Sequence, residues 1–460
     1  TDLLNTLVDR PENQQPGALD HTDHQLNVRS RNIVNLMNER LSNRLLGILK
    51  DIGQTADELD YGAYVVGGFI RDLFLSRNNE DIDIVVEGDG IKFAKKYAKT
   101  VDGRVHAHAK FGTAVVIFPD GYKIDVASAR MEYYTYPAAL PIVEMSSIKL
   151  DLYRRDFSIN TLAVRLNSKW FGTLIDFFSA QKDIKEKVVR VLHNLSFVED
   201  PTRVFRAIRF EQRFQFTIGK LTARLIENAV RMNFFKRLSG KRVLTELKLI
   251  LEEENPPSAF SRLNDFNLLK AIHPSISFND QLADLFTSIK KVLVWYDLLF
   301  LGDAHEKWVV YFLALFRHIN NPKSMKEVFK RLELMPHYQR LFSKERIDAD
   351  RCLRWLEQHI PVENSQLSGR LSLFKIELIL YMMAVTPINK IQQRISYYLT
   401  YLRHIQISLS GNDLKEMDLE PGPTYRHIFD SVRGAKLDGK IKTREGEIEY
   451  ARQLIKQSLS

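Results

Sequence analysis

The sequence predicts an α+β protein, in which a mixed head is followed by a long all-helical part. Short β-rich runs recur between Tyr61 and about Phe178. Helical patterns separate some of these runs, as expected for one mixed sheet with covering helices. From Asp183 to the end, apolar residues recur at helical spacing and β-branched runs are scarce. The two parts of the chain therefore have different architectures.

The first 182 residues divide into two predicted parts. Residues 1–60 form a leader and an N-terminal helix, because the first 28 residues are rich in turn formers and the stretch from Asn32 to about Leu59 has helical spacing, with a break at Gly53. Residues 61–182 form the head. Its predicted strands contain the runs YVV, DIDIVV, TAVVIF, YKIDVAS and FGTLIDFF, and its predicted helices include residues 68–76 and 91–99.

Proline- and glycine-containing segments divide the helical remainder. Breaks are predicted at Pro256-Pro257, at HIPVENSQLSG and at LEPGPTYRHIF. The remainder is therefore divided into a neck (183–255), a body (256–385) and a tail (386–460).

Bulk properties narrow the class of protein. Cys352 is the single cysteine of 460 residues, which excludes an internal disulfide and a multi-cysteine zinc site, and suits a reducing cytoplasm. The sequence contains no apolar run of 18 residues, so no membrane span is expected. The net charge is +9, and residues 201–250 alone hold twelve Lys and Arg against three Asp and Glu. Such a stretch fits a nucleic-acid partner or a solvated helical face, and charge alone leaves both open.

The run DIDIVV places two carboxylates close together. Polar and apolar residues alternate as in a half-buried strand, so Asp81 and Asp83 share one face. Two such carboxylates repel unless a cation compensates, and Mg²⁺ is a natural choice because it takes oxygen ligands and bridges carboxylates to phosphates. Asp125, in YKIDVAS, offers a third carboxylate on another strand. Solvated edge residues are the alternative.

The run VVGGFIRDLFL predicts a strand, a glycine turn and a helix. A glycine turn before a helix lets backbone N–H groups approach phosphates. An ordinary connection with Arg71 and Asp72 solvated is the alternative. The sequence lacks the P-loop pattern, and no G-x-G-x-x-G follows a strand, which argues against a dinucleotide fold.

Together these residues resemble the polymerase-β-type nucleotidyltransferases. The closer resemblance is to class II tRNA nucleotidyltransferases (CCA-adding enzymes) and the related bacterial poly(A) polymerases. Four of the family's five motifs are present in order: GGFIRD with DIDIV, RRDFSINTLAV, EDPTRVFRAIRF and RLSGKRVLTEL. The resemblance covers residues 61–250, and the helical remainder more loosely.

The resemblance implies a role for each matched residue. Asp81, Asp83 and Asp125 would be catalytic and would hold Mg²⁺. Gly67, Gly68 and Arg71 would cradle phosphates with help from Arg155, and Asp156 would contact the ribose 2′-hydroxyl. Asp200 and Arg203 would present an acceptor and a donor fork to the base, a side-chain template that distinguishes cytosine and adenine. The full predicted nucleotide-binding set is Gly67, Gly68, Arg71, Asp72, Arg155, Asp156, Asn160, Asp200, Arg203, Arg206 and Arg209.

Arginines follow the base-reading pair at helical spacing. Arg203, Arg206, Arg209 and Arg213 recur every three or four residues and so lie near one helical face. Arg206 and Arg209 are expected to face phosphates or to support the template. A surface helix with unpaired arginines is the alternative.

One motif departs from the family. The pattern Asp-x-x-x-Gly-x-x-Asp-Leu reads DFFSAQKDI here, with Ala180 at the glycine and Ile184 at the leucine. Alanine fits comfortably only if φ is negative, and head–neck motion is expected to be stiffer if that glycine serves as a hinge.

The predicted activity is template-independent addition of C and/or A to the 3′ end of tRNA. The expected partners are tRNA and CTP or ATP, and the helical body would hold tRNA by shape and backbone. CC-adding members are shortened between the third carboxylate and RRDF, whereas Met131–Tyr153 has ordinary length here, which favours CCA or A addition. A poly(A) polymerase and, from another class, an inactive RNA-binding protein are the alternatives.

Overall fold

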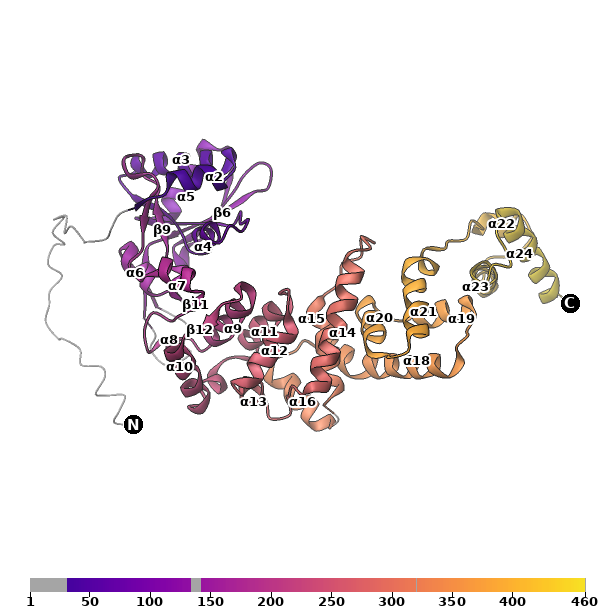
Figure 1. Ribbon diagram of the computed structural model, residues 1–460. Helices are drawn as coiled ribbons and strands as arrows, with labels where there is room; N and C mark the ends of the chain where they lie inside the picture. The colour runs from indigo at the N-terminus through magenta and orange to yellow at the C-terminus, as the bar shows by residue number, and fades with distance from the viewer. Residues whose placement is uncertain (1–30, 134–141, 320, 460) are drawn as a thin grey trace. The chain divides into compact units, whose positions relative to one another are not determined.

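The computed structural model describes residues 31–133, 142–319 and 321–459. A mixed sheet with helices is followed along the chain by helices, which confirms the predicted α+β class (Figure 1). The predicted leader, residues 1–28, lies outside the described residues. The chain forms two compact units. The first comprises the described residues of 1–131, 145–153 and 160–181, and the second those of 132–144, 154–159 and 182–460.

An eight-stranded mixed sheet forms the first unit, in the order β1-β10-β9-β2-β3-β6-β5-β4. Its neighbouring strands are antiparallel except for β3 and β6, which are parallel. The strands are β1 (Arg31–Asn32), β2 (Gly62–Val66), β3 (Ile82–Glu87), β4 (Arg104–His108), β5 (Thr113–Ile117), β6 (Lys123–Ser128), β9 (Ala163–Arg165) and β10 (Thr173–Ile175). Two further strands, β7 (Arg130–Tyr133) and β8 (Ile142–Met145), pair separately.

The predicted β-rich runs overlap five of the strands, namely β2, β3, β5, β6 and β10. The helices that accompany the sheet strands in the chain are α2 (Val34–Arg40), α3 (Asn43–Asp57), α4 (Gly68–Phe74), α5 (Gly90–Thr100), η1 (Ala109–Phe111), α6 (Ile148–Tyr153), η2 (Ser158–Asn160), η3 (Ser168–Trp170) and α7 (Ala180–Glu186). The predicted helices 68–76 and 91–99 correspond to α4 and α5. One cluster of buried hydrophobic residues includes Tyr64 of β2, Val85 of β3 and Leu152 of α6.

The predicted N-terminal helix breaks at a different place than expected. It consists of α2 and α3, and α3 begins after Ser42, whose side chain accepts the N–H of Leu45. Gly53, the expected break, lies inside α3. A Cβ at Gly53 would lie 2.0 Å from the carbonyl oxygen of Leu166, so glycine serves close packing there.

Replacing Gly53 by alanine is therefore expected to destabilise the first unit by about 2 kcal/mol or more, because the backbone of residue 166 would have to shift. Gly47 lies in the same helix, and a Cβ added there would meet nothing within 4 Å. Gly47→Ala should be neutral or stabilising by up to about 1 kcal/mol. Thermal unfolding of both variants tests this, and equal melting temperatures would contradict it.

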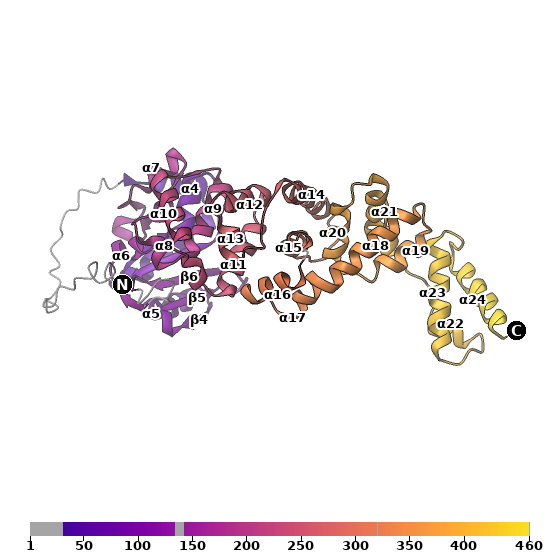
Figure 2. The same cartoon turned by 90° about the horizontal axis from the view of Figure 1, so that it is seen from below.

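The second unit is mostly helical (Figure 2). Its first helices are α8 (Ser196–Glu199), α9 (Thr202–Phe214), α10 (Lys220–Arg231), η4 (Phe234–Arg237), α11 (Gly240–Leu251), α12 (Pro256–Asp265), α13 (Leu268–Ile272) and α14 (Asp280–Asp297). The next are α15 (Lys307–Arg317), α16 (Pro322–Arg331), α17 (Pro336–Arg340), the π-helical η5 (Leu341–Glu345), α18 (Arg346–His359), α19 (Asn364–Leu371), α20 (Ile376–Val385), α21 (Asn389–Thr400) and η6 (Leu402–His404). The last are α22 (Gly411–Lys415), α23 (Pro423–Leu437) and α24 (Arg444–Leu459).

The neck is not purely helical, although the sequence predicts helices alone. Two short parallel strands, β11 (Val188–Val189) and β12 (Thr217–Ile218), pair within it. All four residues are β-branched, which favours an extended backbone. Two-residue runs of this kind are too short to produce a period-two pattern in the sequence.

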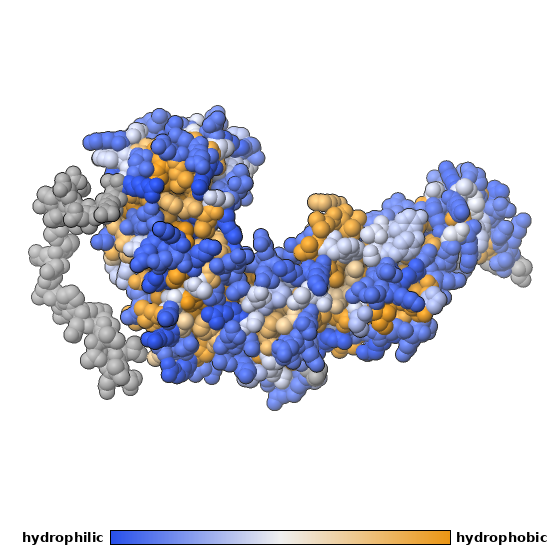
Figure 3. All heavy atoms as spheres, in the orientation of Figure 1, coloured by the Kyte–Doolittle hydropathy of each residue, from blue (hydrophilic) through white to orange (hydrophobic). Residues whose placement is uncertain are grey.

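The second unit buries α15 and exposes the end of α14. Residues 308–316 of α15 are all buried. In Figure 3 an apolar patch covers the C-terminal end of α14, where Leu298 and Phe300 are exposed. Across the part of the chain that the structure describes, no helix is both long and apolar enough to span a bilayer.

Candidate functional site

The first unit aligns two of the predicted carboxylates on adjacent strands. Asp83 of β3 and Asp125 of β6 are register partners across the parallel pair. Ile82 and Ile84 are buried while Asp81 is exposed and Asp83 half-buried, so the predicted alternation is present. Asp81 immediately precedes β3.

Electrostatic repulsion is present near the N-terminal ends of β3 and β6. Partial burial and, after it, the charge of Asp81 raise the pKa of the Asp125 carboxyl. Among the described residues, no group of three or more His, Cys, Asp or Glu side chains is gathered closely enough to hold a metal ion. The three carboxylates nevertheless supply the oxygen donors that a hard divalent cation takes, and such a cation would relieve their repulsion. The donor set therefore fits a divalent metal.

The glycine turn precedes α4, and a buried polar network follows it. Gly67 has φ +73°, a conformation that favours glycine, and its N–H donates to the carbonyl of Leu162. Arg71 is buried. Its Nε and Nη2 donate to the two oxygens of Asp72 at 2.9 Å each, and its Nη1 donates to Asn160 at 2.6 Å. Arg71, Asp72 and Asn160 are thus brought together, and Arg71 and Asp72 are buried rather than solvated.

Asn79 extends this network to the carboxylates. Its amide donates to Asp72 at 2.8 Å, and its amide oxygen accepts the backbone N–H of Asp81 at 2.8 Å. Sequence reasoning missed Asn79. An Asn two residues before a D-x-D is compatible with an Asx turn, which is the signal that could have identified it.

The second unit holds the residues of RRDF and EDPTR. Asp156 is buried, and its carboxylate accepts the N–H of Phe157 and the Nε and Nη2 of Arg206, the latter two at 2.8 and 2.6 Å. Arg155 is half-buried beside it. Arg206 therefore joins α9 to the RRDF segment. Its expected support of the base-reading pair stays a prediction.

Arg203 is also held within the protein. Its side chain is 6% exposed. Its Nη1 donates to the hydroxyl of Ser196 and its Nη2 to the carbonyl of Arg154, both at 2.8 Å. Glu199 lies 3.6 Å from its Nη1 and 3.4 Å from His193. Burial raises the pKa of Glu199 and lowers the pKa of His193. The bonds to Ser196 and Arg154 fix the orientation of the Arg203 guanidinium, which has five N–H donors in all.

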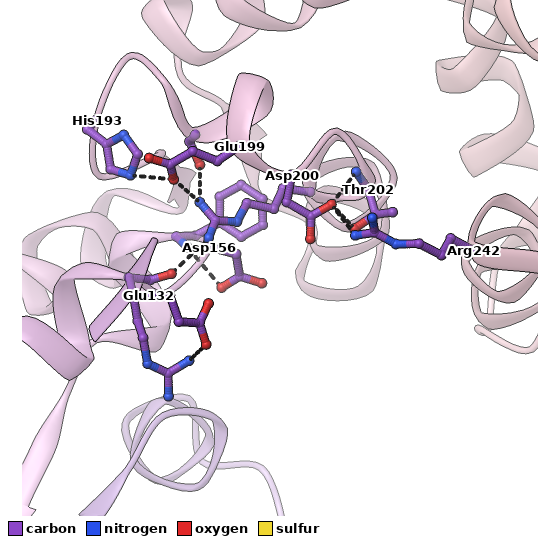
Figure 4. A network of polar contacts seen from close by, with 11 residues as sticks. Glu132, Asp156, His193, Glu199, Asp200, Thr202 and Arg242 are labelled. Atoms are coloured by element: carbon purple, nitrogen blue, oxygen red, sulfur yellow. Dashed lines mark hydrogen bonds and ion pairs between the residues drawn. The ribbon is translucent and has the colours of Figure 1, made fainter. Parts of the chain in front are cut away.

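Asp200 presents one occupied and one available oxygen. Its Oδ1 accepts the N–H and the hydroxyl of Thr202, at 2.9 and 2.6 Å, and Nη2 of Arg242 at 2.8 Å. Within the described residues, its Oδ2 accepts no hydrogen bond. Figure 4 shows Arg242 and Asp200 pointing toward each other at one side of the network, with Glu132 and His193 at the other. Arg242 belongs to RLSGKRVLTEL, the last of the four matched motifs, and was not among the predicted site residues.

The remaining arginines of α9 have acidic neighbours. Arg209 and Arg213 lie 3.6 and 3.7 Å from Glu253. Each of the four predicted arginines thus has a carboxylate within ion-pair distance, so α9 is not a stripe of unpaired charge. Six exposed cations of the neck follow α9 in the chain: Lys220, Arg224, Arg231, Lys236, Arg237 and Lys241.

Glu246 of α11 is a buried carboxyl near Arg206 and Arg209, and its Oε2 has no hydrogen-bond partner within the described residues. Burial raises its pKa above the ordinary value, although both arginines oppose this. Because the carboxyl binds its proton more tightly in the folded state than in the unfolded state, protonation stabilises the fold at low pH. This contribution to the free energy of unfolding is lost as pH rises through the folded-state pKa.

Glu246→Gln is therefore expected to raise the melting temperature at pH 8 and to raise it less at pH 5, because the amide removes a buried charge whose population falls as pH falls. Thermal unfolding at both pH values checks this, with exposed Glu227→Gln as the control that should change neither. Equal loss of stability at both pH values would contradict the account.

Ala180 occupies the position where the family has glycine. It begins α7, and its N–H donates to Asp176 at 2.7 Å. Ser179, not Ala180, takes a positive φ, of 59°. Alanine therefore fits here, and the stiffer head–neck motion stays a prediction.

Two protein-family models match parts of the chain. Residues 63–190 match the model of the poly(A) polymerase head domain, and residues 215–279 match that of a probable RNA- and SrmB-binding site of polymerase A. The chain is 46% identical over 458 residues to an A-adding tRNA nucleotidyltransferase of Geobacter sulfurreducens, covering 99% of this chain and 52% of the relative. The chain thus spans about half the length of that relative.

Two further relatives match over almost their whole length. An A-adding tRNA nucleotidyltransferase of Halalkalibacterium halodurans is 30% identical, with 94% of this chain and 98% of the relative covered. The structure of the Thermotoga maritima CCA-adding enzyme complexed with tRNA matches with a TM-score of 0.73 and 32% identity, covering 93% of this chain and 99% of that one. These matches confirm the resemblance drawn from the sequence motifs.

Proposed function

Because the chain belongs to the family of tRNA nucleotidyltransferases, we propose that it adds the terminal adenosine to tRNA that ends in CC. The register pair Asp83–Asp125, with Asp81 beside it, carries the proposal of nucleotide transfer. The choice of adenosine is supported by the two relatives named A-adding, at 46% and 30% identity. Action in the cytoplasm stays a prediction from the single cysteine.

Asp81, Asp83 and Asp125 would hold Mg²⁺ near the N-terminal ends of the central strands β3 and β6. Bound there, Mg²⁺ would supply a lowered pKa for the attacking 3′-hydroxyl and neutralisation of the triphosphate charge. The chain's own contribution is to fix the carboxylates. The strand register aligns Asp83 with Asp125, and Asn79 holds the backbone of Asp81. Gly67, Gly68, Arg71 and Arg155 are proposed to bind the phosphates, with Arg71 acting from its buried pair with Asp72.

Asp200 would recognise the exocyclic amine of the base. Its Oδ1 is fixed by Thr202 and Arg242, which leaves Oδ2 as an oriented acceptor. Adenine and cytosine each carry such an amine, whereas guanine and uracil present an acceptor at the equivalent position. This accounts for exclusion of GTP and UTP. Arg203 would then choose between adenine and cytosine through its guanidinium N–H donors.

The exposed cations of the neck would bind the tRNA backbone. Most of them lie within residues 215–279, the segment that matches a probable RNA-binding site. Exposed Lys and Arg side chains bind phosphates without reading sequence, so this surface would recognise the shape of tRNA.

CCA addition is the second candidate, because the Thermotoga relative is a CCA-adding enzyme. A poly(A) polymerase is the third, because the head-domain model carries that name. Incubation with ATP and CTP of a tRNA that lacks CC, a tRNA that ends in CC and an unrelated RNA separates them by product sequencing. Adenosine addition to the second substrate alone is expected. Addition of CCA to the first, or a long A tail on the third, would replace the proposal by the corresponding candidate.

A further inference from the structure

A pocket lies in the second unit, among elements that have no role in the proposed chemistry. Its volume is about 720 Å³, and residues from the end of α15, from α16, from the α17–η5 segment and from α18 line it. Figure 2 labels these helices. A volume of this size suits a small organic ligand, because ligand pockets span roughly 300–1,000 Å³.

Positive charge predominates in the lining. Arg317, Lys326, Arg340 and Arg346 line the pocket, against the single carboxylate of Asp350. Lys326 is exposed and has no ion-pair partner among the described residues. Arg340 lies 2.8 Å from Glu345, and its side chain is 68% exposed. The pocket therefore favours an anion.

Arg346 is held in place at the pocket wall. Its side chain is 9% exposed. Its Nη1 donates to Asp350 at 2.9 Å and its Nε to the carbonyl of Phe342 at 3.1 Å. That carbonyl is available because the π-helical turn directs the N–H of Arg346 to Leu341 instead. Within the described residues Nη2 donates to no protein group, so an oriented N–H donor remains beside the pocket.

Arg317 strengthens this arrangement. Its Nη1 donates to Asp350 at 2.6 Å and to the hydroxyl of Tyr381 at 3.0 Å. Asp350 thus orients both arginines. Charge-assisted bonds to a carboxylate fix guanidinium groups in the geometry that phosphate recognition uses.

The lining also contains apolar side chains, beside the polar Gln339 and Ser343. Met325, Phe329 and Ile347 contribute to the wall. Inorganic phosphate alone would not use these residues, whereas a planar base could contact them while its phosphate meets the cations. We propose that this pocket binds a phosphate-bearing nucleotide, either free or as one nucleotide of a bound RNA. The proposal uses none of the residues given a role in nucleotide addition.

Photo-crosslinking with 8-azido-AMP, followed by mass-spectrometric mapping of labelled peptides, tests the proposal. Label is expected in peptides from residues 317–350. The double variant Lys326→Ala, Arg340→Ala should reduce that label at least tenfold, because both cations face the phosphate. The matched variant Lys323→Ala, Lys330→Ala removes two exposed charges of α16 that do not line the pocket, and should change the label less than twofold.

Added tRNA distinguishes the two sources of the nucleotide. Displacement of the pocket label by tRNA would identify an RNA nucleotide, and retention of the label would identify a free one. Label on head peptides is a separate signal that reports the proposed catalytic site. Absence of label from residues 317–350, or equal label in the first double variant and the wild type, would overturn the proposal whatever the head peptides show.

Discussion

Asp83→Asn is expected to lower the rate of nucleotide addition on the order of 10³-fold, because loss of a metal-binding carboxylate removes several kcal/mol of transition-state stabilisation. Asp83 is the register partner of Asp125 on the adjacent parallel strand, so its carboxylate stands at the centre of the proposed site. The substitution keeps the shape of the side chain and removes its charge. Single-turnover incorporation of labelled ATP into tRNA ending in CC measures the effect.

The control for this variant is Asp102→Asn, in the same unit. Asp102 is exposed and has φ +51°, a conformation that asparagine tolerates. Its rate should match that of the wild type, and both variants should keep the wild-type melting temperature within a few degrees. Full activity of Asp83→Asn would refute the assignment of the metal ligands.

Asp200→Asn should have the second-largest effect and should change selectivity. An asparagine can still cap Thr202 through its amide oxygen, but it offers an NH₂ donor where the base amine requires an acceptor. Loss of one base-reading interaction costs about 1–3 kcal/mol, so kcat/KM for ATP should fall by roughly 5- to 150-fold. Discrimination against GTP and UTP should weaken at the same time.

The relevant readout is the ratio of kcat/KM values for the four nucleotides, since a purely structural defect would lower all of them together. Asp284→Asn, at an exposed position of α14, is the matched control and should leave the ratios unchanged. If Asp200→Asn kept the wild-type preference for ATP, Asp200 would not read the base.

The sequence predicted the central strands β2, β3 and β6, each of which carries buried apolar residues. It missed β4, which has the sequence RVHAH and lies at the edge of the sheet, where none of its side chains is buried. The break at Ser42 was missed because a glycine further along the chain gave a stronger local signal, although tertiary packing explains that glycine.

Motif spacing identified the site residues but not their partners. Asp156 binds Arg206, 50 positions away, and Asp200 binds Arg242, 42 positions away. Such pairs depend on how α9 packs with the RRDF segment and α11, which no local pattern encodes. The same holds for Arg203, whose predicted donor fork is held by Ser196 and the backbone of Arg154.

The central claim is addition of one adenosine to tRNA ending in CC, and nucleotide choice on that substrate tests it most directly. Wild-type protein, Mg²⁺ and tRNA ending in CC are mixed with equal concentrations of labelled ATP and CTP, and the products are sequenced. The account predicts one added A per tRNA and no further extension. Absence of incorporation, addition of C, or a tail of many A residues would contradict it.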